Sequence, residues 1–228
     1  MRCFENTNSS LDFGGTRTTD SDLAAIDLSK LRKLSVRMTD ITDASYGTLA
    51  ELTSLEYLDL SQNKITNSGF NRLDSLRNLR TLLVDSTNIS NEGLVVIRSM
   101  PWLTRIDLDF LKVSDSFFDS LCYLNEMQQL SLFGTDTSNE QLASISVLSE
   151  LRELDLGETK IDDHCLSVIA ELPNLRLLGL YGTKITDDGL RLLETMKNLQ
   201  LIELGKTLVS QTGMKRFKSS LPNCTIEM

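Results

Sequence analysis

Apolar residues recur along this chain with a period of 24 residues. The first position of the unit is apolar in eight consecutive units, at Leu31, Leu55, Leu79, Leu103, Met127, Leu151, Leu175 and Leu199. Further apolar residues follow three and five positions later in every unit, as at Leu34 and Val36. Alternation of apolar and polar residues is typical of a strand with one buried face. Each unit therefore predicts a short strand near its start.

The second half of each unit has a helical pattern. Apolar residues stand three positions apart, as at Tyr46, Leu49 and Leu52, which predicts a short helix with one buried face. Each predicted helix is preceded by a residue suited to an N-cap, namely Thr42, Thr66, Ser90, Ser114, Ser138, Asp162, Thr186 and Ser210. The next residue is Asp, Asn or Gln, and we interpret its frequent negative charge as a complement to the helix dipole.

A single unit of this kind cannot bury its apolar stripe, whereas stacked units share a continuous core. The sequence therefore predicts one α/β solenoid domain, with a curved parallel sheet on its concave side and short helices on its convex side. We expect a degenerate first repeat acting as an N-terminal cap at 1–30, eight 24-residue repeats at 31–220, and a C-terminal capping strand at 221–228.

The unit from Leu175 to Leu190 reads Leu-x-x-Leu-x-Leu-x-x-Thr-x-Ile-Thr-Asp-x-Gly-Leu. This pattern resembles the leucine-rich-repeat superfamily in its ITDxGL subtype, which occurs in bacterial repeat arrays and in the repeat tails of F-box receptors of ubiquitin ligases. The resemblance covers nearly the whole chain and implies a right-handed leucine-rich-repeat solenoid. It implies binding without naming a ligand, since the superfamily is a general binding scaffold.

The ninth position of the unit separates these two groups. F-box receptors usually have Cys there and longer units, whereas this chain has mostly Thr, as at Thr39 and Thr183, in units of 24 residues. No F-box-like helical segment precedes the repeats in this sequence. The chain is therefore more similar to the bacterial arrays.

Composition narrows the choice of partner. The net charge is −9, which disfavours nucleic acid and an acidic membrane surface as partners. No apolar run is long enough to span a bilayer, and Met1–Asn6 lacks the apolar core of a signal peptide. We expect a soluble protein of unknown compartment, with the cytoplasm slightly favoured. The irregular spacing of Cys3, Cys122, Cys165 and Cys224 predicts free thiols.

Residues between the buried strand positions face the concave side and are free of packing constraints. The acids there are Asp59, Asp85, Asp107, Asp109, Glu153, Asp155 and Glu203, and the bases are Lys33, Arg37 and Arg105. Seven acids against three bases predict an acidic groove. Such a groove is either a solvated surface kept soluble by charge or a surface that steers a basic partner.

Aromatic residues also occur on this face, at Tyr57, Phe133 and Tyr181. They suit strands by propensity, and exposed aromatics flanked by charge are also typical of interface hot spots. The fourth full repeat is irregular, with Phe110, Leu111 and Phe117 in rows that are otherwise mostly small or polar, after the single tryptophan, Trp102. These residues indicate either local repacking of the core or an exposed binding patch. We place the binding centre around Asp109, Phe110 and Phe133.

Metal binding and catalysis find little support. Asp85, Asp107 and Asp109 could reach one cation, but calcium usually recruits more oxygen ligands, so we expect no metal. His164 adjoins Cys165 in the first turn of a predicted helix, which does not make a nucleophile and base that face each other. The chain has no phosphate-binding or dinucleotide motif. We expect no enzymatic activity and no cofactor.

The sequence thus predicts a monomeric, non-enzymatic recognition module that binds a basic or amphipathic protein on its acidic concave sheet. The candidate partner-binding residues are Tyr57, Asp85, Arg105, Asp107, Asp109, Phe110, Phe133, Asp155 and Tyr181. One alternative is a structural repeat array of a larger envelope or assembly protein. Another is the substrate-receptor part of an F-box-type ubiquitin ligase without its adaptor-binding segment.

Overall fold

The computed structural model describes residues 9–27 and 29–228. Within them, ten three-residue strands form one parallel sheet in which each strand pairs with the next along the chain. The strands are β1 (Ser10–Asp12), β2 (Lys33–Ser35), β3 (Tyr57–Asp59), β4 (Thr81–Leu83), β5 (Arg105–Asp107), β6 (Gln129–Ser131), β7 (Glu153–Asp155), β8 (Leu177–Gly179), β9 (Leu201–Glu203) and β10 (Thr225–Glu227). From β2 onward, paired residues are 24 apart, as in Leu34 opposite Leu58. The predicted α/β solenoid is confirmed.

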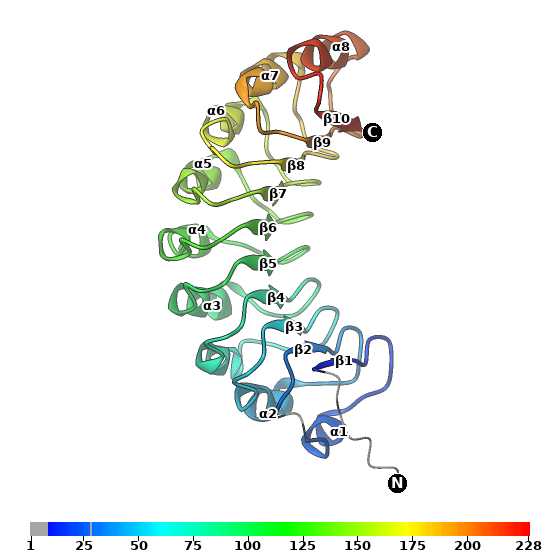
Figure 1. The fold of residues 1–228 in the computed structure, drawn as a ribbon, viewed down its shortest axis with the longest axis vertical. Helices are drawn as coiled ribbons and strands as arrows, with labels where there is room; N and C mark the ends of the chain where they lie inside the picture. Colours follow the sequence, from blue (N-terminus) through cyan, green and yellow to red (C-terminus); the bar gives the residue numbers. More distant parts are fainter. Residues whose placement is uncertain (1–8, 28) are drawn as a thin grey trace.

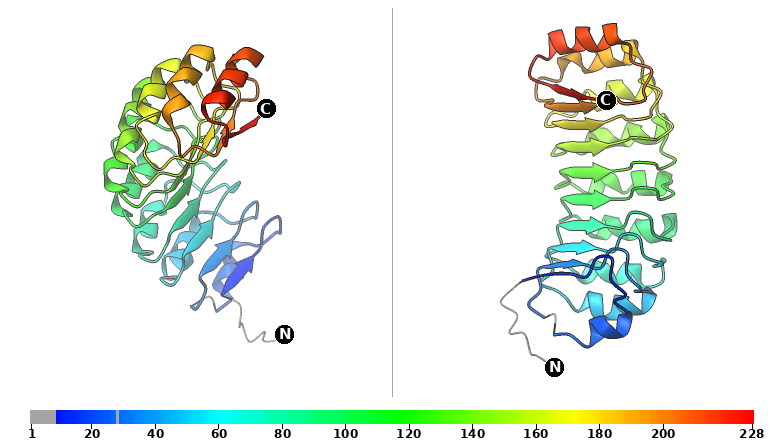
Figure 2. Two further views of the ribbon diagram at one scale, coloured as in Figure 1. Left: turned by 45° about the horizontal axis from the view of Figure 1, so that its top comes forward. Right: turned by 90° about the vertical axis from the view of Figure 1, so that its right-hand side faces the viewer.

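Short helices cover the outer side of the arc, and the strands line its inner, concave side (Figures 1 and 2). The α-helices are α1 (Asp20–Ala24), α2 (Tyr46–Ala50), α3 (Asn91–Leu94), α4 (Asp115–Phe118), α5 (Asn139–Leu142), α6 (Leu166–Ile169), α7 (Asp187–Leu192) and α8 (Gln211–Ser220). Turns of 3₁₀ helix accompany them at η1 (Asp43–Ser45), η2 (Phe70–Ser75), η3 (Val95–Ser99), η4 (Leu121–Tyr123), η5 (Ala143–Val147), η6 (Asp163–Cys165) and η7 (Leu193–Thr195). Because helices are wider than strands, the stack bends toward the strands.

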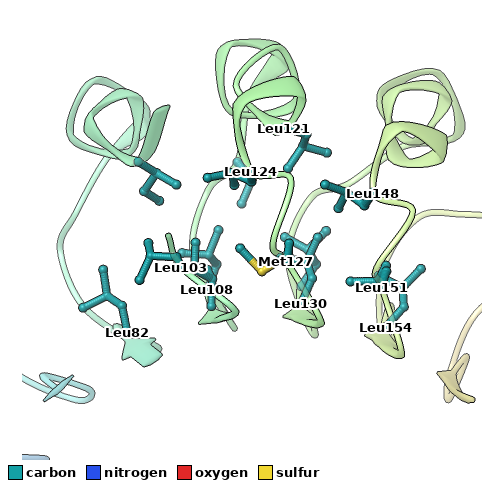
Figure 3. Packing of buried hydrophobic residues seen from close by; sticks show 14 of the residues in the cluster. Leu82, Leu103, Leu108, Leu121, Leu124, Met127, Leu130, Leu148, Leu151 and Leu154 are labelled. Atoms are coloured by element: carbon teal, nitrogen blue, oxygen red, sulfur yellow. The ribbon is translucent and has the colours of Figure 1, made fainter. Parts of the chain in front are cut away.

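The core is one continuous layer between the strands and the helices. Around β5 and β6, Leu103, Leu108 and Leu130 from the strand side meet Leu121 and Leu124 from the helix side (Figure 3). All five are at most 2% exposed. Each repeat therefore stabilises its neighbours by burying their apolar stripes, at about 25 cal/mol per Å² of apolar surface removed from water.

A tight turn follows each strand and is closed by the threonine row. The Thr183 hydroxyl donates to the Leu180 carbonyl at 2.6 Å. Equivalent bonds are made by Thr39, Thr87, Thr135, Thr159 and Thr207. The residue before the ninth position of each unit has a positive φ, whether the ninth residue is threonine or not; the non-glycine cases are Met38, Gln62, Ser86, Phe110, Glu158 and Lys206. The turn thus forces a left-handed conformation that costs non-glycine residues about 1–2 kcal/mol.

The polar row after each N-cap links successive repeats. Asp163 accepts hydrogen bonds from the backbone N–H of Thr186, at 2.8 Å, and from its hydroxyl. The same link to the next repeat joins Asp20 to Thr42, Asp43 to Thr66, Asn67 to Ser90, Asn91 to Ser114, Asn139 to Asp162 and Asp187 to Ser210. Asp115 departs from this pattern, because its carboxylate accepts from the Gln141 side chain instead. Interaction with the helix dipole alone was therefore an incomplete interpretation of this row.

The irregular fourth repeat is mostly a repacked core. Leu111 and Phe117 are 3% and 0% exposed, so they cannot form an exposed patch. Trp102 donates its indole N–H to the Leu76 carbonyl at 3.0 Å, and the Arg77 guanidinium lies 4.4 Å from its ring centroid. Phe110 differs from them, with 58% of its surface exposed.

Cys122, Cys165 and Cys224 are free thiols, whereas Cys3 and the segment Met1–Asn6 lie outside the described residues. None of the helices in the described part of the chain is long and apolar enough to cross a membrane.

Candidate functional site

The acids predicted for the concave face differ in how much of their surface solvent can reach. Asp59 and Asp85 are only 5% and 6% exposed. The carboxylate of Asp85 lies 3.4 Å from the guanidinium of Arg37, which stands two repeats earlier. Asp107, Asp109 and Asp155 remain partly exposed. Asp85, although a candidate, therefore presents little surface to a partner, and the accessible negative charge lies further along, on β5, β7 and the turn after β5.

Local hydrogen bonds hold the accessible carboxylates in place. The Oδ1 atom of Asp107 accepts from the backbone N–H of Asp109 at 3.1 Å. The Oδ1 atom of Asp109 in turn accepts from the Ser131 hydroxyl and, at 2.9 Å, from the Phe133 N–H. Asp155 Oδ1 accepts from the Gly157 N–H at 2.9 Å. These bonds fix each side chain through one oxygen.

Positive charge nearby does not offset the burial of these carboxylates, although Arg105 partly counters it at Asp107. Burial raises the pKa of Asp107 to about 7, and the nearby charge of Asp109 adds to the rise. Burial also raises the pKa values of Asp109 and Asp155 above their usual range. A cation close to these groups would favour their charged forms, because an opposite charge lowers the pKa of a carboxyl. The site is thus suited to receiving a basic group.

Three aromatic candidates come together beside these acids. The ring centroids of Phe110 and Phe133 are 5.5 Å apart in an edge-to-face arrangement. The Phe133 and Tyr181 rings are stacked with centroids 6.5 Å apart, although their strands β6 and β8 are not neighbours. Lys206 Nζ lies 4.9 Å from the centroid of Tyr181. We call Phe110, Phe133 and Tyr181 the aromatic ledge.

Glycines make room for the aromatic ledge. A Cβ atom at Gly134 would lie 2.6 Å from the Phe110 ring, and a Cβ at Gly157 would lie 2.6 Å from the Phe133 ring. Real Cβ atoms do not approach that closely, so both rings occupy space that a side chain in the following repeat would fill. The sequence signal for the aromatic ledge was therefore an aromatic residue with glycine one repeat later, which the residue-by-residue analysis missed.

The remaining candidates, Tyr57 and Arg105, lie on β3 and β5, outside the aromatic ledge. Tyr57 shares a shallow groove at the N-terminal end of the sheet with Asp12, Lys33 and Arg37. Burial raises the pKa of its hydroxyl. The candidate residues thus divide into a mixed-charge N-terminal group and an acidic, aromatic middle group.

Metal binding and thiol chemistry are the other candidate chemistries of the described residues. In the part of the chain that the structure describes, no three His, Cys, Asp or Glu side chains are grouped to hold a metal ion. The His164 ring contacts the Asp162 carboxylate at 2.7 Å, and the Cys165 thiol donates to the Asp162 carbonyl. Burial raises the pKa of Cys165 to about 12, which keeps the thiol protonated.

The repeated strand, closed turn and capped helix define a leucine-rich-repeat protein. The leucine-rich repeat region family matches residues 17–226, and the chain belongs to that family. Leucine-rich-repeat proteins are typically protein-interaction modules and are generally not enzymes. None of the curated proteins gives a significant match to the sequence.

Two solved structures illustrate the likeness in fold. Internalin C2 of Listeria monocytogenes is 21% identical over 92% of this chain and 84% of its own, with a TM-score of 0.65. A leucine-rich-repeat protein of Leptospira interrogans is 20% identical over 88% of this chain, with a TM-score of 0.56. This chain spans 61% of the Leptospira protein. At these identities the likeness concerns the fold alone.

Proposed function

We propose that this chain is a monomeric, non-enzymatic recognition module whose acidic concave sheet binds a basic or amphipathic segment of a partner protein. The observation that carries the proposal is the position of the half-buried carboxylates of Asp107, Asp109 and Asp155 next to the aromatic ledge. Charge would steer the partner, and the rings would supply the apolar contact area.

A solvated surface that serves only solubility is a weaker account of these residues. Solubility is served by fully hydrated charges, whereas burial of the Asp107 carboxylate raises its pKa and lowers stability at neutral pH. Phe110 is equally hard to explain by folding, since it is an apolar residue with 58% of its surface exposed to solvent. Both costs are accounted for if a partner covers this surface.

We further propose the finer assignments of the family and of the ends. The chain would belong to the ITDxGL subtype with 24-residue units, as in bacterial arrays. Residues 1–30 would cap the N-terminal end, and residues 221–228 would cap the C-terminal end. The pairing of β1 with β2 and of β10 with β9 supports this division.

Affinity capture from the source cell tests the proposed function. The double variant Asp107→Lys, Asp109→Lys reverses the charge of the concave face in one repeat. We expect it to lose the captured partner while its melting temperature falls by no more than a few degrees, because both side chains are partly exposed.

The matched control reverses two charges of the same repeat on the helix side. Asp115 and Asp119 are both exposed there, so Asp115→Lys with Asp119→Lys makes the same change in net charge. We expect this variant to retain the partner. Capture that survives the concave double variant, or that is lost equally in both, would contradict the proposal. Light scattering across concentrations would reveal self-association, which the alternative of a structural array requires.

A further inference from the structure

One row of the concave face carries an acid on every second strand. Sheet register aligns Asp107 with Ser131, Ser131 with Asp155, Asp155 with Gly179 and Gly179 with Glu203. The acids therefore alternate with Ser131 and Gly179. The Asp155 carboxylate leans over Gly179, where a Cβ atom would clash with Asp155 Oδ1. We call Asp107, Asp155 and Glu203 the acidic row.

The spacing of the acidic row selects the conformation of a bound segment. Adjacent strands lie about 4.8 Å apart, so the backbone positions of successive acids are separated by about 9.6 Å. A polyproline II helix rises about 3.1 Å per residue and returns to the same face every three residues, or about 9.3 Å. Across the three acids the separation is about 19.2 Å, against about 18.6 Å for two turns of this helix.

Other conformations fit the acidic row less well. An extended strand presents side chains on one face about every 6.8 Å, which does not match about 9.6 Å. An α-helix returns to nearly the same face after seven residues, or about 10.5 Å, and is about 1.8 Å too long across the three acids. The strands line the concave side of the arc (Figure 1). Side chains that project from a concave face converge, so their tips lie closer together than the strands that carry them. Curvature therefore improves the match to polyproline II and worsens the match to an α-helix.

The aromatic ledge runs beside the acidic row, from β5 to β8. Within a unit, a residue of the aromatic ledge stands two or three positions after the position of the acidic row. This offset separates the two rows by about 7–10 Å along the strand direction. Domains that recognise polyproline II segments pack the proline rings against grooves lined by aromatic side chains. A polyproline II helix has three faces, so one face can meet the acidic row while a neighbouring face meets the rings.

The acidic row calls for basic residues on the face of the polyproline II helix that meets it. Burial raises the pKa values of all three members, and the charge of Asp155 raises that of Glu203 further. An arginine or lysine at each acid would supply the missing positive charge. Prolines add little ordering cost, since polyproline II forms in the free peptide.

We propose that the concave face binds a polyproline II segment of its partner, with a basic residue at every third position on Asp107, Asp155 and Glu203 and prolines against the aromatic ledge. The inference rests on the proposed function and specifies its partner. It needs no residue beyond those of β5 to β9 and their turns.

Three labelled peptides of equal charge test this inference by fluorescence anisotropy in 0.15 M salt, roughly the physiological ionic strength. The first is capped (Pro-Pro-Arg)₅, the second has the same composition with its arginines contiguous, and the third is (Gly-Ser-Arg)₅. We expect the first to bind at least roughly tenfold more tightly than the others, a difference of about 1.4 kcal/mol. If charge alone determined affinity, the three peptides would bind equally, or the peptide with contiguous arginines would bind most tightly.

Variants locate the bound peptide. Asp155→Asn keeps an oxygen that can accept from Gly157 and removes the charge, and Phe133→Ala removes the centre of the aromatic ledge. Each should weaken (Pro-Pro-Arg)₅ by roughly tenfold. The helix-side controls Asp119→Asn and Tyr123→Ala remove an exposed acid and an exposed aromatic and should have no effect.

The outcomes separate this inference from the proposed function. Equal affinity for the three peptides, or no binding of the first, would overturn the polyproline II inference. So would an unchanged affinity in both concave variants. None of these results changes the outcome of the capture experiment, which asks only whether the partner needs the concave face. The polyproline II inference can therefore fail while the proposed function stands.

Discussion

Replacing the Asp107 carboxyl by an amide tests whether the concave face holds a charge that the folded chain disfavours. Asp107→Asn keeps an oxygen that can accept from the Asp109 N–H and removes the charge. Burial raises the pKa of Asp107 from 3.8 to about 7 in the folded protein. The folded form therefore retains a proton that the unfolded chain has released, so the free energy of unfolding falls as the pH rises between these values.

The pKa values set the size of the effect. The stabilisation from this proton is complete below pH 3.8 and is lost as the pH passes through about 7. At ~1.4 kcal/mol per pH unit, a rise in pKa from 3.8 to about 7 corresponds to at most about 4 kcal/mol. About half of that loss, at most ~2 kcal/mol, falls between pH 5.5 and 8. This window stays above the pI of about 4.7.

Urea unfolding of the wild type and the variant at several pH values between 5.5 and 8 measures the difference. We expect Asp107→Asn to gain stability relative to the wild type by ~1–2 kcal/mol across this window. Asp187→Asn is the control, because hydrogen bonds from Ser210 hold the pKa of Asp187 below its usual value, so its difference from wild type should be flat here. An Asp107→Asn difference that is constant, or that falls with rising pH, would refute the reasoning.

Three further predictions concern stability and can be measured by the same unfolding experiments. Asp163→Ala should lower the free energy of unfolding by ~2 kcal/mol, because it removes two hydrogen bonds to the next repeat. Asp115→Ala should lower it by under ~0.5 kcal/mol, because the Asp115 carboxylate accepts a single exposed hydrogen bond, from the Gln141 side chain. Equal losses would contradict the role of these links. Thr183→Val should cost ~1 kcal/mol by removing the bond that closes its turn, and no loss would show that the turn forms without it. Phe110→Gly and Met38→Gly both relieve a positive φ and should raise the free energy of unfolding. The rise should be ~1 kcal/mol smaller for Phe110→Gly, because this variant also loses the contact with the Phe133 ring. An equal rise in both variants would argue against a stable aromatic ledge.

The order and register of the sheet could be predicted from sequence because the repeat length is constant. Stacked units of 24 residues leave a single parallel register, in which Leu34 pairs with Leu58. The β1 and β2 strands pair with an offset of 23 residues, as Leu11 opposite Leu34 shows. The first unit is therefore one residue shorter than the units that follow it.

The identity of the concave residues was also predictable, whereas their accessibility was not. Alternation along a strand assigns a side chain to a face, but burial depends on neighbours from other repeats. Arg37 reaches Asp85 across 48 residues of sequence, and Phe133 meets Tyr181 across the same separation. Such contacts follow from side-chain length and from a small residue in the repeat between, Ser61 for the first contact and Gly157 for the second, which the period alone does not reveal.

The irregular rows were the hardest to interpret from sequence. Phe117 stands where other repeats have Gly93 or Gly189, and those glycines make room for the polar link from the preceding repeat. A bulky residue in this row could point inward or outward, and in the structure Phe117 is buried. The Trp102 indole donates to a carbonyl of the preceding repeat, as the Asn78 side chain does one repeat earlier.

The most direct test of partner recognition by the concave face is photo-cross-linking from two matched positions of one repeat. Phe110 lies at the end of β5 on the concave side and is 58% exposed, and Tyr123 lies in η4 on the helix side and is 53% exposed. Each is replaced separately by benzoylphenylalanine, and the protein is irradiated with extract of the source cell. We expect a covalent adduct with the partner from position 110 and none from position 123. An adduct from position 123 with none from position 110 would contradict recognition on the concave face.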